Sequence, residues 1–360
     1  MRAREFRIRR RRAALVNKMT NRERVIAAVK HSDLDYTPHN VFFTGQMLKK
    51  MEEHTKNADY ISTVGNHISR ERVSSFRAPI PGRRGYAMDE FGVVFDQTGI
   101  DKDIGNVIEF QIGSLEELAR YDPPPVDEGQ LHSRCGSLVR AKGENFSMAS
   151  LGFSLFERAW TLCGMEDMLC YMKTDPEVVH SLFEKLTGRN LKILRTVLEY
   201  DIDAVYFGDD WGQQRGLIMG PEIWRSMIKP YFARMYGAVR AAGKTVVQHS
   251  CGDLREILGD FSEIGMDIYQ TFQPEIYDIV KYKKILNGKL TIWGGISTQA
   301  HLPFKTPGEI YEITRNTIEV LGKGGGYIAA PTHDVPGDVP PENTDAMVRA
   351  FFDQHEKRTD

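Results

Sequence analysis

The chain has 360 residues, of which 41% are hydrophobic and 27% are charged, a composition typical of a globular protein with a sizeable core. Its formal net charge of −2 and pI of about 6.6 argue against nucleic acid as the main partner. The sequence has no apolar run long enough to span a membrane. Its four scattered cysteines are too few for a disulfide framework, which indicates a reducing, cytoplasmic location.

The chain begins with a strongly basic segment, residues 1–18, which contains seven arginines and a single acidic residue. The segment lacks the apolar stretch that a secretory signal needs after its arginines. One interpretation is an arm that binds nucleic acid or an anionic surface. We favour the other, a disordered or non-native start, which leaves residues 19–360 as one folded domain.

The folded part is expected to begin with a helix at residues 20–31, because Thr20 and Glu23 have the spacing of a capping box. Residues 39–43 are the first strand candidate. Two further short strands are predicted within residues 88–99 and 105–113.

From residue 145 onward, short apolar strands alternate with long amphipathic helices. The predicted strands are residues 146–152, 204–210, 244–252, 266–272, 290–296 and 326–333, and the longest helical stretches are 175–201 and 220–243. This alternation is typical of a parallel sheet with both faces covered. With residues 39–43 and one more upstream strand, the six units would close a single (β/α)8 barrel of the TIM type. A doubly wound open sheet is the alternative, but the sequence lacks the G-x-G-x-x-G fingerprint that would favour it.

Three residues at predicted strand ends have the side chains of zinc ligands. His249 and Cys251 are two apart, so on a strand they project from the same face. His333 follows the last predicted strand, and the C-terminal ends of barrel strands are where active sites are built. Imidazole and thiolate ligands suit zinc, and three protein ligands with one open position are typical of a catalytic zinc. The alternative is a buried, apolar cysteine at an ordinary strand end.

Three carboxylates near the same strand ends are candidates for catalysis. Asp209 and Asp210 follow one strand, and Glu157 lies between another strand and a helix. Each could act as an acid or base or as a metal ligand. Adjacent strand residues face opposite ways, so at most one of the two aspartates points into the barrel mouth. Stabilisation of a helix start is the alternative role.

A further four residues are predicted to bind substrate. Tyr206, Trp211 and Trp293 flank strand ends and could wall a pocket, although barrel core is the alternative for Tyr206. Asp89 is the fourth candidate, with a solvated turn as its alternative. The glycine-rich segment 322–331 lacks the Walker spacing and precedes a strand, so it is interpreted as a turn.

The sequence also resembles a known family, the uroporphyrinogen decarboxylase superfamily, whose members are β/α barrels. The matching segments are residues 19–39, 89–95, 208–232, 249–254 and 324–348. The decarboxylases of this superfamily bind a tetrapyrrole with many carboxylates through arginines near the first strand. Residues 41–51 of this chain contain no arginine, so the resemblance does not extend to that binding motif.

A second branch of the superfamily consists of corrinoid- and zinc-dependent methyltransferases, including methylcobamide:coenzyme M methyltransferases and demethylases of methoxylated compounds. Their zinc motif is H-x-C followed much later by a second cysteine. His249 and Cys251 match the motif, and His333 stands where those enzymes place the cysteine. The resemblance therefore implies Zn²⁺ as a cofactor and a corrinoid carried by a partner protein.

The exchange of a cysteine for His333 changes the charge of the implied site. Two imidazoles and one thiolate leave the zinc site with a net charge of +1, which favours polarising the oxygen of a methyl ether. We therefore expect a methyltransferase that moves a methyl group between a small O-methyl compound and the corrinoid. The alternatives are a metal-free lyase of the decarboxylase type, with His333 as general acid, and a non-catalytic barrel that binds a tetrapyrrole or corrinoid. No nucleic-acid or membrane partner is expected, and the sequence leaves the oligomeric state open, with a homodimer as one possibility.

Overall fold

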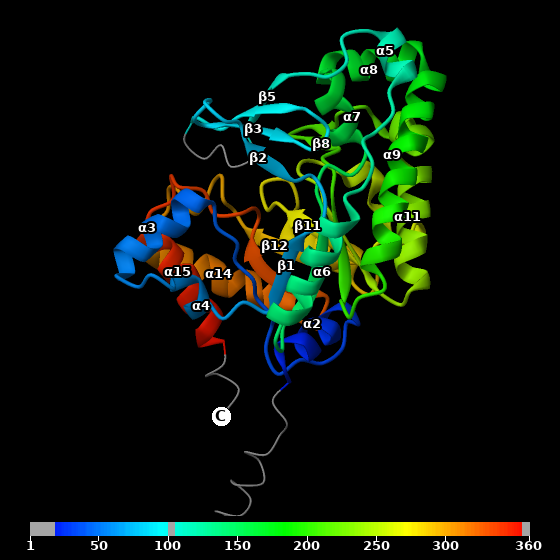
Figure 1. Ribbon diagram of the computed structural model, residues 1–360. Helices are drawn as coiled ribbons and strands as arrows, with labels where there is room; N and C mark the ends of the chain where they lie inside the picture. The colour runs from blue at the N-terminus through cyan, green and yellow to red at the C-terminus, as the bar shows by residue number, and fades with distance from the viewer. Residues whose placement is uncertain (1–18, 100–104, 355–360) are drawn as a thin grey trace, which may run out of the picture.

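The fold is built on seven parallel strands that curl into a barrel (Figure 1). The computed structural model describes residues 19–99 and 105–354, so the basic segment 1–18 and its predicted role lie outside the described residues. The strands, in the order in which they neighbour one another, are β1 (Ile68–Arg72), β6 (Phe146–Leu151), β7 (Ala204–Gly208), β10 (Thr245–His249), β11 (Ile268–Phe272), β12 (Thr291–Ile296) and β13 (Tyr327–Pro331). Six of them coincide with the six strands predicted after residue 145.

The eighth position of the barrel is taken by residues 39–43, which do not form a regular strand. They pair with β13 and its following loop through two isolated bridges, His39 with Ala329 and Phe43 with Val335. On the other side, the backbone amide of His67 donates to the carbonyl of His39. The predicted eight-unit barrel is therefore correct in topology, but the prediction of a continuous strand at residues 39–43 is wrong.

Side-chain amides replace the missing ladder on the β1 side. Asn66 donates to the carbonyl of Val41 and accepts from its amide, at 2.9 and 2.8 Å. The Asn40 side chain accepts from the amide of Ile68 at 3.1 Å. These two asparagines satisfy backbone groups that a regular strand would pair with each other.

The interior of the barrel is apolar at its N-terminal end. Its buried cluster consists of Val25, Ile68, Phe146, Met148, Ala204, Tyr206, Val247, Ile268, Trp293, Ile328 and Ala330. Because side chains alternate along a strand, the next inward positions, such as Arg70 and His249, lie nearer the C-terminal ends. Val25 comes from α2 (Asn21–Val29), which closes the N-terminal end of the barrel, and the predicted capping box of Thr20 and Glu23 begins this helix.

Helices cover the outside of the barrel. In chain order the remaining helices are α3 (Gly45–Thr55), α4 (Tyr60–Thr63), α5 (Leu115–Arg120), α6 (Glu128–Ala141), α7 (Phe156–Cys163), α8 (Met165–Thr174), α9 (Pro176–Val197), α10 (Pro221–Ile223), α11 (Lys229–Ala241), α12 (Leu258–Glu263), α13 (Ile279–Leu286), α14 (Pro307–Gly322) and α15 (Pro341–Asp353). A π-helical turn at Trp224–Ile228 joins α10 to α11, and a 3-10 turn at Arg255–Ile257 precedes α12. No helix in the described part of the chain is long and apolar enough to cross a membrane.

A small antiparallel sheet stands over the barrel at the end opposite α2 (Figure 1). Its strands are β2 (Arg77–Pro79), β3 (Tyr86–Asp89), β4 (Val94–Asp96) and β5 (Asn106–Glu109), and a two-stranded ribbon is formed by β8 (Gly212–Gln213) and β9 (Gly216–Leu217). A buried ion pair ties this sheet to α7, because Arg158 Nη1 donates to Asp89 Oδ2 at 2.6 Å. The Asp89 carboxylate also accepts from the amides of Phe91 and Val93.

This buried pair is expected to matter for stability. Asp89→Ala leaves the Arg158 guanidinium buried without its partner, so the free energy of unfolding should fall by about 3–5 kcal/mol. Glu109→Ala on the same sheet removes the partner of Arg83 in an exposed pair, where a loss of about 0–1 kcal/mol is expected. Guanidinium denaturation measures the free energy of unfolding of each variant. Equal decreases in the two variants would contradict the assigned role of the buried pair.

Candidate functional site

A cavity of about 880 Å³ opens at the C-terminal ends of the barrel strands. Residues from the ends of β1, β6, β7, β10, β11 and β13 line it. Of the ten predicted site residues, six line this cavity: Glu157, Tyr206, Asp210, His249, Cys251 and His333. The barrel thus brings together residues that are up to 176 positions apart in the chain, because the C-terminal ends of parallel strands meet at one edge.

The three predicted metal ligands form one cluster. The ligand atoms of His249, Cys251 and His333 all lie within 4.8 Å of one another. His249 Nε2 and Cys251 Sγ are 3.7 Å apart, which agrees with their predicted projection from the same face. The rings of His249 and His333 meet edge to face at 5.4 Å between centroids.

A glutamine on the neighbouring strand fixes the orientation of His249. His249 Nδ1 donates to Gln270 Oε1, and the Tyr206 hydroxyl donates to the same oxygen at 3.1 Å. An imidazole that donates through Nδ1 leaves Nε2 free to accept or to bind a metal. Burial lowers the pKa of His249, so the neutral ring that metal binding requires is favoured.

Cys251 lies beside the carboxylate of Asp210 and at a close contact between two backbone segments. The backbone amide of Cys251 donates to Asp210 Oδ1 at 2.8 Å. Burial and the Asp210 carboxylate raise the pKa of the Cys251 thiol, so the thiolate needs a nearby cation. Gly252 follows with φ +87°, and a Cβ there would lie 2.2 Å from the backbone of Gly212, so only glycine allows this loop to pass behind Cys251.

The two aspartates after β7 point in different directions, as their adjacency predicts. Asp210 lines the cavity, and its Oδ1 lies 3.6 Å from His249 Nε2. Asp209 is fully buried and lies outside the cavity lining. Its carboxylate accepts from the amides of Leu155, Phe156 and Glu157 at the start of α7, which is the helix-capping alternative rather than an acid–base position.

Glu157 is the carboxyl group in the cavity that is best placed to carry a proton. Burial, followed by the nearby Asp210 and Asp209 carboxylates, raises the pKa of Glu157 well above its usual value. Its side chain is half-buried and lines the cavity, so a carboxyl group with a raised pKa faces the space where a ligand would lie.

Only one of the four predicted substrate-binding residues lines the cavity. That residue is Tyr206, whose hydroxyl reaches Gln270. Trp211 is fully buried and donates from its indole to Asp209 Oδ2 at 2.8 Å, and Trp293 lies in the apolar layer inside the barrel. Asp89 is buried in the ion pair with Arg158, away from the cavity lining. Their large or charged side chains serve packing and pairing here.

Sequence reasoning missed two arginines in the cavity wall. Arg70 and Arg72 lie on β1 and both line the cavity. Residues 41–51 lack arginine, but β1 supplies two arginines to the cavity wall. The signal was available in the alternating pattern of residues 68–72, although no apolar run marked this segment as a barrel strand.

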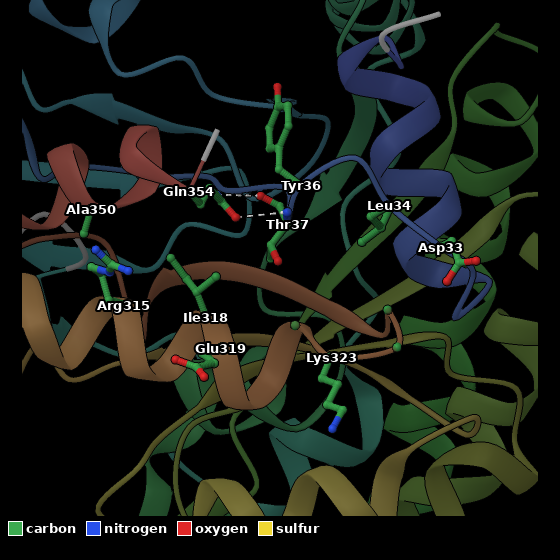
Figure 2. Close-up of a pocket in the computed structure, with 13 residues that line it drawn as sticks. Asp33, Leu34, Tyr36, Thr37, Arg315, Ile318, Glu319, Lys323, Ala350 and Gln354 are labelled. Carbon is green, nitrogen blue, oxygen red and sulfur yellow. Dashed lines mark hydrogen bonds between the residues drawn. The ribbon is translucent and has the colours of Figure 1, made fainter. Parts of the chain in front are cut away.

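A second cavity of about 740 Å³ lies at the N-terminal end of the barrel (Figure 2). It lies between α14 and the loop at residues 33–37, and the Gln354 side chain closes one side through paired hydrogen bonds with the backbone of Thr37. Among the described residues no histidine or cysteine lines it, so their cluster of chemically reactive side chains belongs to the cavity at the other end.

Comparison with known proteins agrees with the barrel. The methylated-thiol–coenzyme M methyltransferase of Methanosarcina mazei is 23% identical over 195 residues, which cover 54% of this chain and half of that protein. The uroporphyrinogen decarboxylase of Chlorobaculum parvum is 24% identical over 283 residues, covering 74% of this chain and 78% of that enzyme. The solved structure of a methyltransferase from Methanosarcina mazei superposes with a TM-score of 0.69 at 15% identity, covering 93% of this chain and 99% of that one.

The family model described as uroporphyrinogen decarboxylase (URO-D) matches residues 20–353, which is nearly all of the folded domain. The chain therefore belongs to the uroporphyrinogen decarboxylase (URO-D) family.

Proposed function

We propose that this protein is a zinc-dependent methyltransferase that moves a methyl group from a small O-methyl compound to a corrinoid on a partner protein. The observation that carries the proposal is the cluster of His249, Cys251 and His333 at the mouth of the barrel. The similarity to a methylated-thiol–coenzyme M methyltransferase supports the reaction class.

The cluster fits a zinc ion. The 3.7 Å between His249 Nε2 and Cys251 Sγ is close to the about 3.6 Å that separates nitrogen and sulfur ligands of tetrahedral zinc. The neutral His249 ring, held through Nδ1 by Gln270, has the outer hydrogen bond that zinc-bound histidines commonly make. Zinc bound by two imidazoles and one thiolate would supply Lewis-acid character toward an ether oxygen.

The protein supplies a proton donor for the leaving oxygen. When the methyl carbon passes to the corrinoid, the carbon–oxygen bond breaks and its electron pair stays on oxygen, which then needs a proton. The raised pKa of Glu157 favours its protonated form, and its side chain faces the cavity. Its carboxyl group is therefore assigned as the general acid, whereas Asp210 accepts from the Cys251 amide and steadies the ligand loop.

The charges of the cavity favour this reaction over decarboxylation of a tetrapyrrole with many carboxylates. Two arginines line the wall, but four carboxylic residues line it as well: Glu157, Asp210, Asp334 and Asp338. A polyanion would be repelled by at least the aspartates among them. A small substrate with far fewer carboxylates than a tetrapyrrole, held beside soft metal ligands, suits the same wall better.

Metal content tests the proposed ligands. The purified protein should contain about one zinc per chain by mass spectrometry of the metal. His333→Ala should lose most of it, because two ligands bind zinc far more weakly than three. His180→Ala, which alters a histidine bonded to Tyr231 on the outside of the barrel, should keep the full amount. Full zinc retention in His333→Ala would contradict the site.

Turnover tests the role of Glu157. Methylation of free cob(I)alamin by a panel of methoxylated compounds should slow by about a hundredfold in Glu157→Gln, which keeps the shape but cannot give up a proton. In the wild type the rate should fall as pH rises through the raised pKa of Glu157, because the proton is present below that pKa and lost above it. The variant should lack this alkaline limb.

A control variant and one contradicting outcome complete that experiment. Glu53→Gln on the exposed face of α3 should turn over at the wild-type rate with the wild-type pH profile. Wild-type turnover by Glu157→Gln, with its alkaline limb intact, would show that another group protonates the leaving oxygen.

A further inference from the structure

The cavity has a cationic wall that the proposed methyl transfer does not use. Arg70 and Arg72 are two apart on β1, so both project into the barrel mouth, and both line the cavity. Arg70 lies over the ring of Phe42, with its guanidinium carbon 3.9 Å from the ring centroid. The guanidinium group of Arg70 is thereby held in a defined place rather than swinging in solvent.

The two arginines share one nearby carboxylate, that of Asp334. Arg70 Nη2 lies 3.6 Å from Asp334 Oδ2, which is too long for a good hydrogen bond. Arg72 donates weakly to the carbonyl of Ser75 at 3.4 Å, and among residues 19–99 and 105–354 no carboxylate forms an ion pair with it. Burial and the nearby Arg70 lower the pKa of Arg72, and the Asp334 carboxylate offsets this effect only in part.

A hydroxyl group completes the polar wall. Ser150 lies directly opposite Arg72 in the pairing of β1 with β6, and it lines the cavity. Ser150 lies two residues after Met148 and four after Phe146, whose side chains fill the barrel interior. Because every second residue of a strand faces the same side, the Ser150 hydroxyl also points inward. The wall therefore offers two guanidinium groups and one hydroxyl to a ligand in the cavity.

This wall lies one aromatic ring away from the metal cluster. The Arg70 guanidinium carbon is 5.3 Å from the centroid of the Tyr206 ring, and that centroid is 6.0 Å from the centroid of His249. A ligand about the size of one substituted ring would reach from His249 to the arginines along the Tyr206 face.

We propose that the substrate of this site carries a carboxylate group, which Arg72 binds with the help of Arg70 while the methoxy group lies at the histidine–cysteine cluster. The inference rests on the proposed function for the methoxy end and on the cationic wall for the other end. A planar guanidinium binds a carboxylate through two parallel hydrogen bonds, and the anion relieves the repulsion between the two arginines.

Equilibrium binding tests the carboxylate directly. Calorimetry with the full-length protein would compare the three methoxybenzoates and methoxyacetate with their uncharged amides at low ionic strength. At least one acid should bind about tenfold more tightly than its amide, because charged hydrogen bonds contribute more than neutral ones. In Arg72→Met this preference should disappear, whereas Arg72→Lys should keep part of it through charge alone.

Controls separate binding from folding and from turnover. Arg234→Met, which removes an exposed partner of Glu184, should keep the full preference. The circular dichroism spectrum and zinc content of each variant should match the wild type. The proposal is overturned if every amide binds as tightly as its acid, or if Arg72→Met retains the preference. Arg72-dependent binding without methyl transfer would reject only the proposed function, and transfer from neutral donors without any preference for acids would reject only the carboxylate.

Discussion

The alternation of side chains along parallel strands is the constraint on which the site depends. On each barrel strand every second residue faces inward, so a strand that contributes an apolar residue to the inner layer presents its next inward residue nearer the mouth. Val247 is followed in this way by His249 and then by Cys251, and Ile68 by Arg70. The apolar layer and α2 fill the barrel below, so ligands can meet these groups only at the open end.

Much of this arrangement could be predicted from the sequence. Six barrel strands, the capping box of α2 and the common face of His249 and Cys251 follow from local patterns of two to four residues. Residues 39–43 could not be assigned correctly, because the Asn66 side chain satisfies the backbone of Val41 and the Asn40 side chain accepts from the amide of Ile68. Such pairing leaves no periodic signal.

The roles of the individual polar residues were also hard to predict, because they depend on contacts with residues distant in the sequence. Asp209 caps α7 through amides more than fifty positions away, and Asp89 pairs with Arg158 across two elements. Neither contact is encoded in the residues beside the aspartate. The glutamine that orients His249 comes from the next strand, and only the register of β10 with β11 makes it a neighbour.

The two walls of the cavity differ in chemistry, and the proposed function depends on this difference. One wall holds soft ligands beside carboxylates, the other holds two arginines with few partners, and the Tyr206 ring contacts both. X-ray absorption at the zinc edge of the purified protein measures the ligands of the proposed zinc site. We expect one sulfur at about 2.3 Å and two imidazole nitrogens at about 2.0–2.1 Å, with the remaining ligand a light atom. A first shell with two sulfurs, or with none, would contradict it.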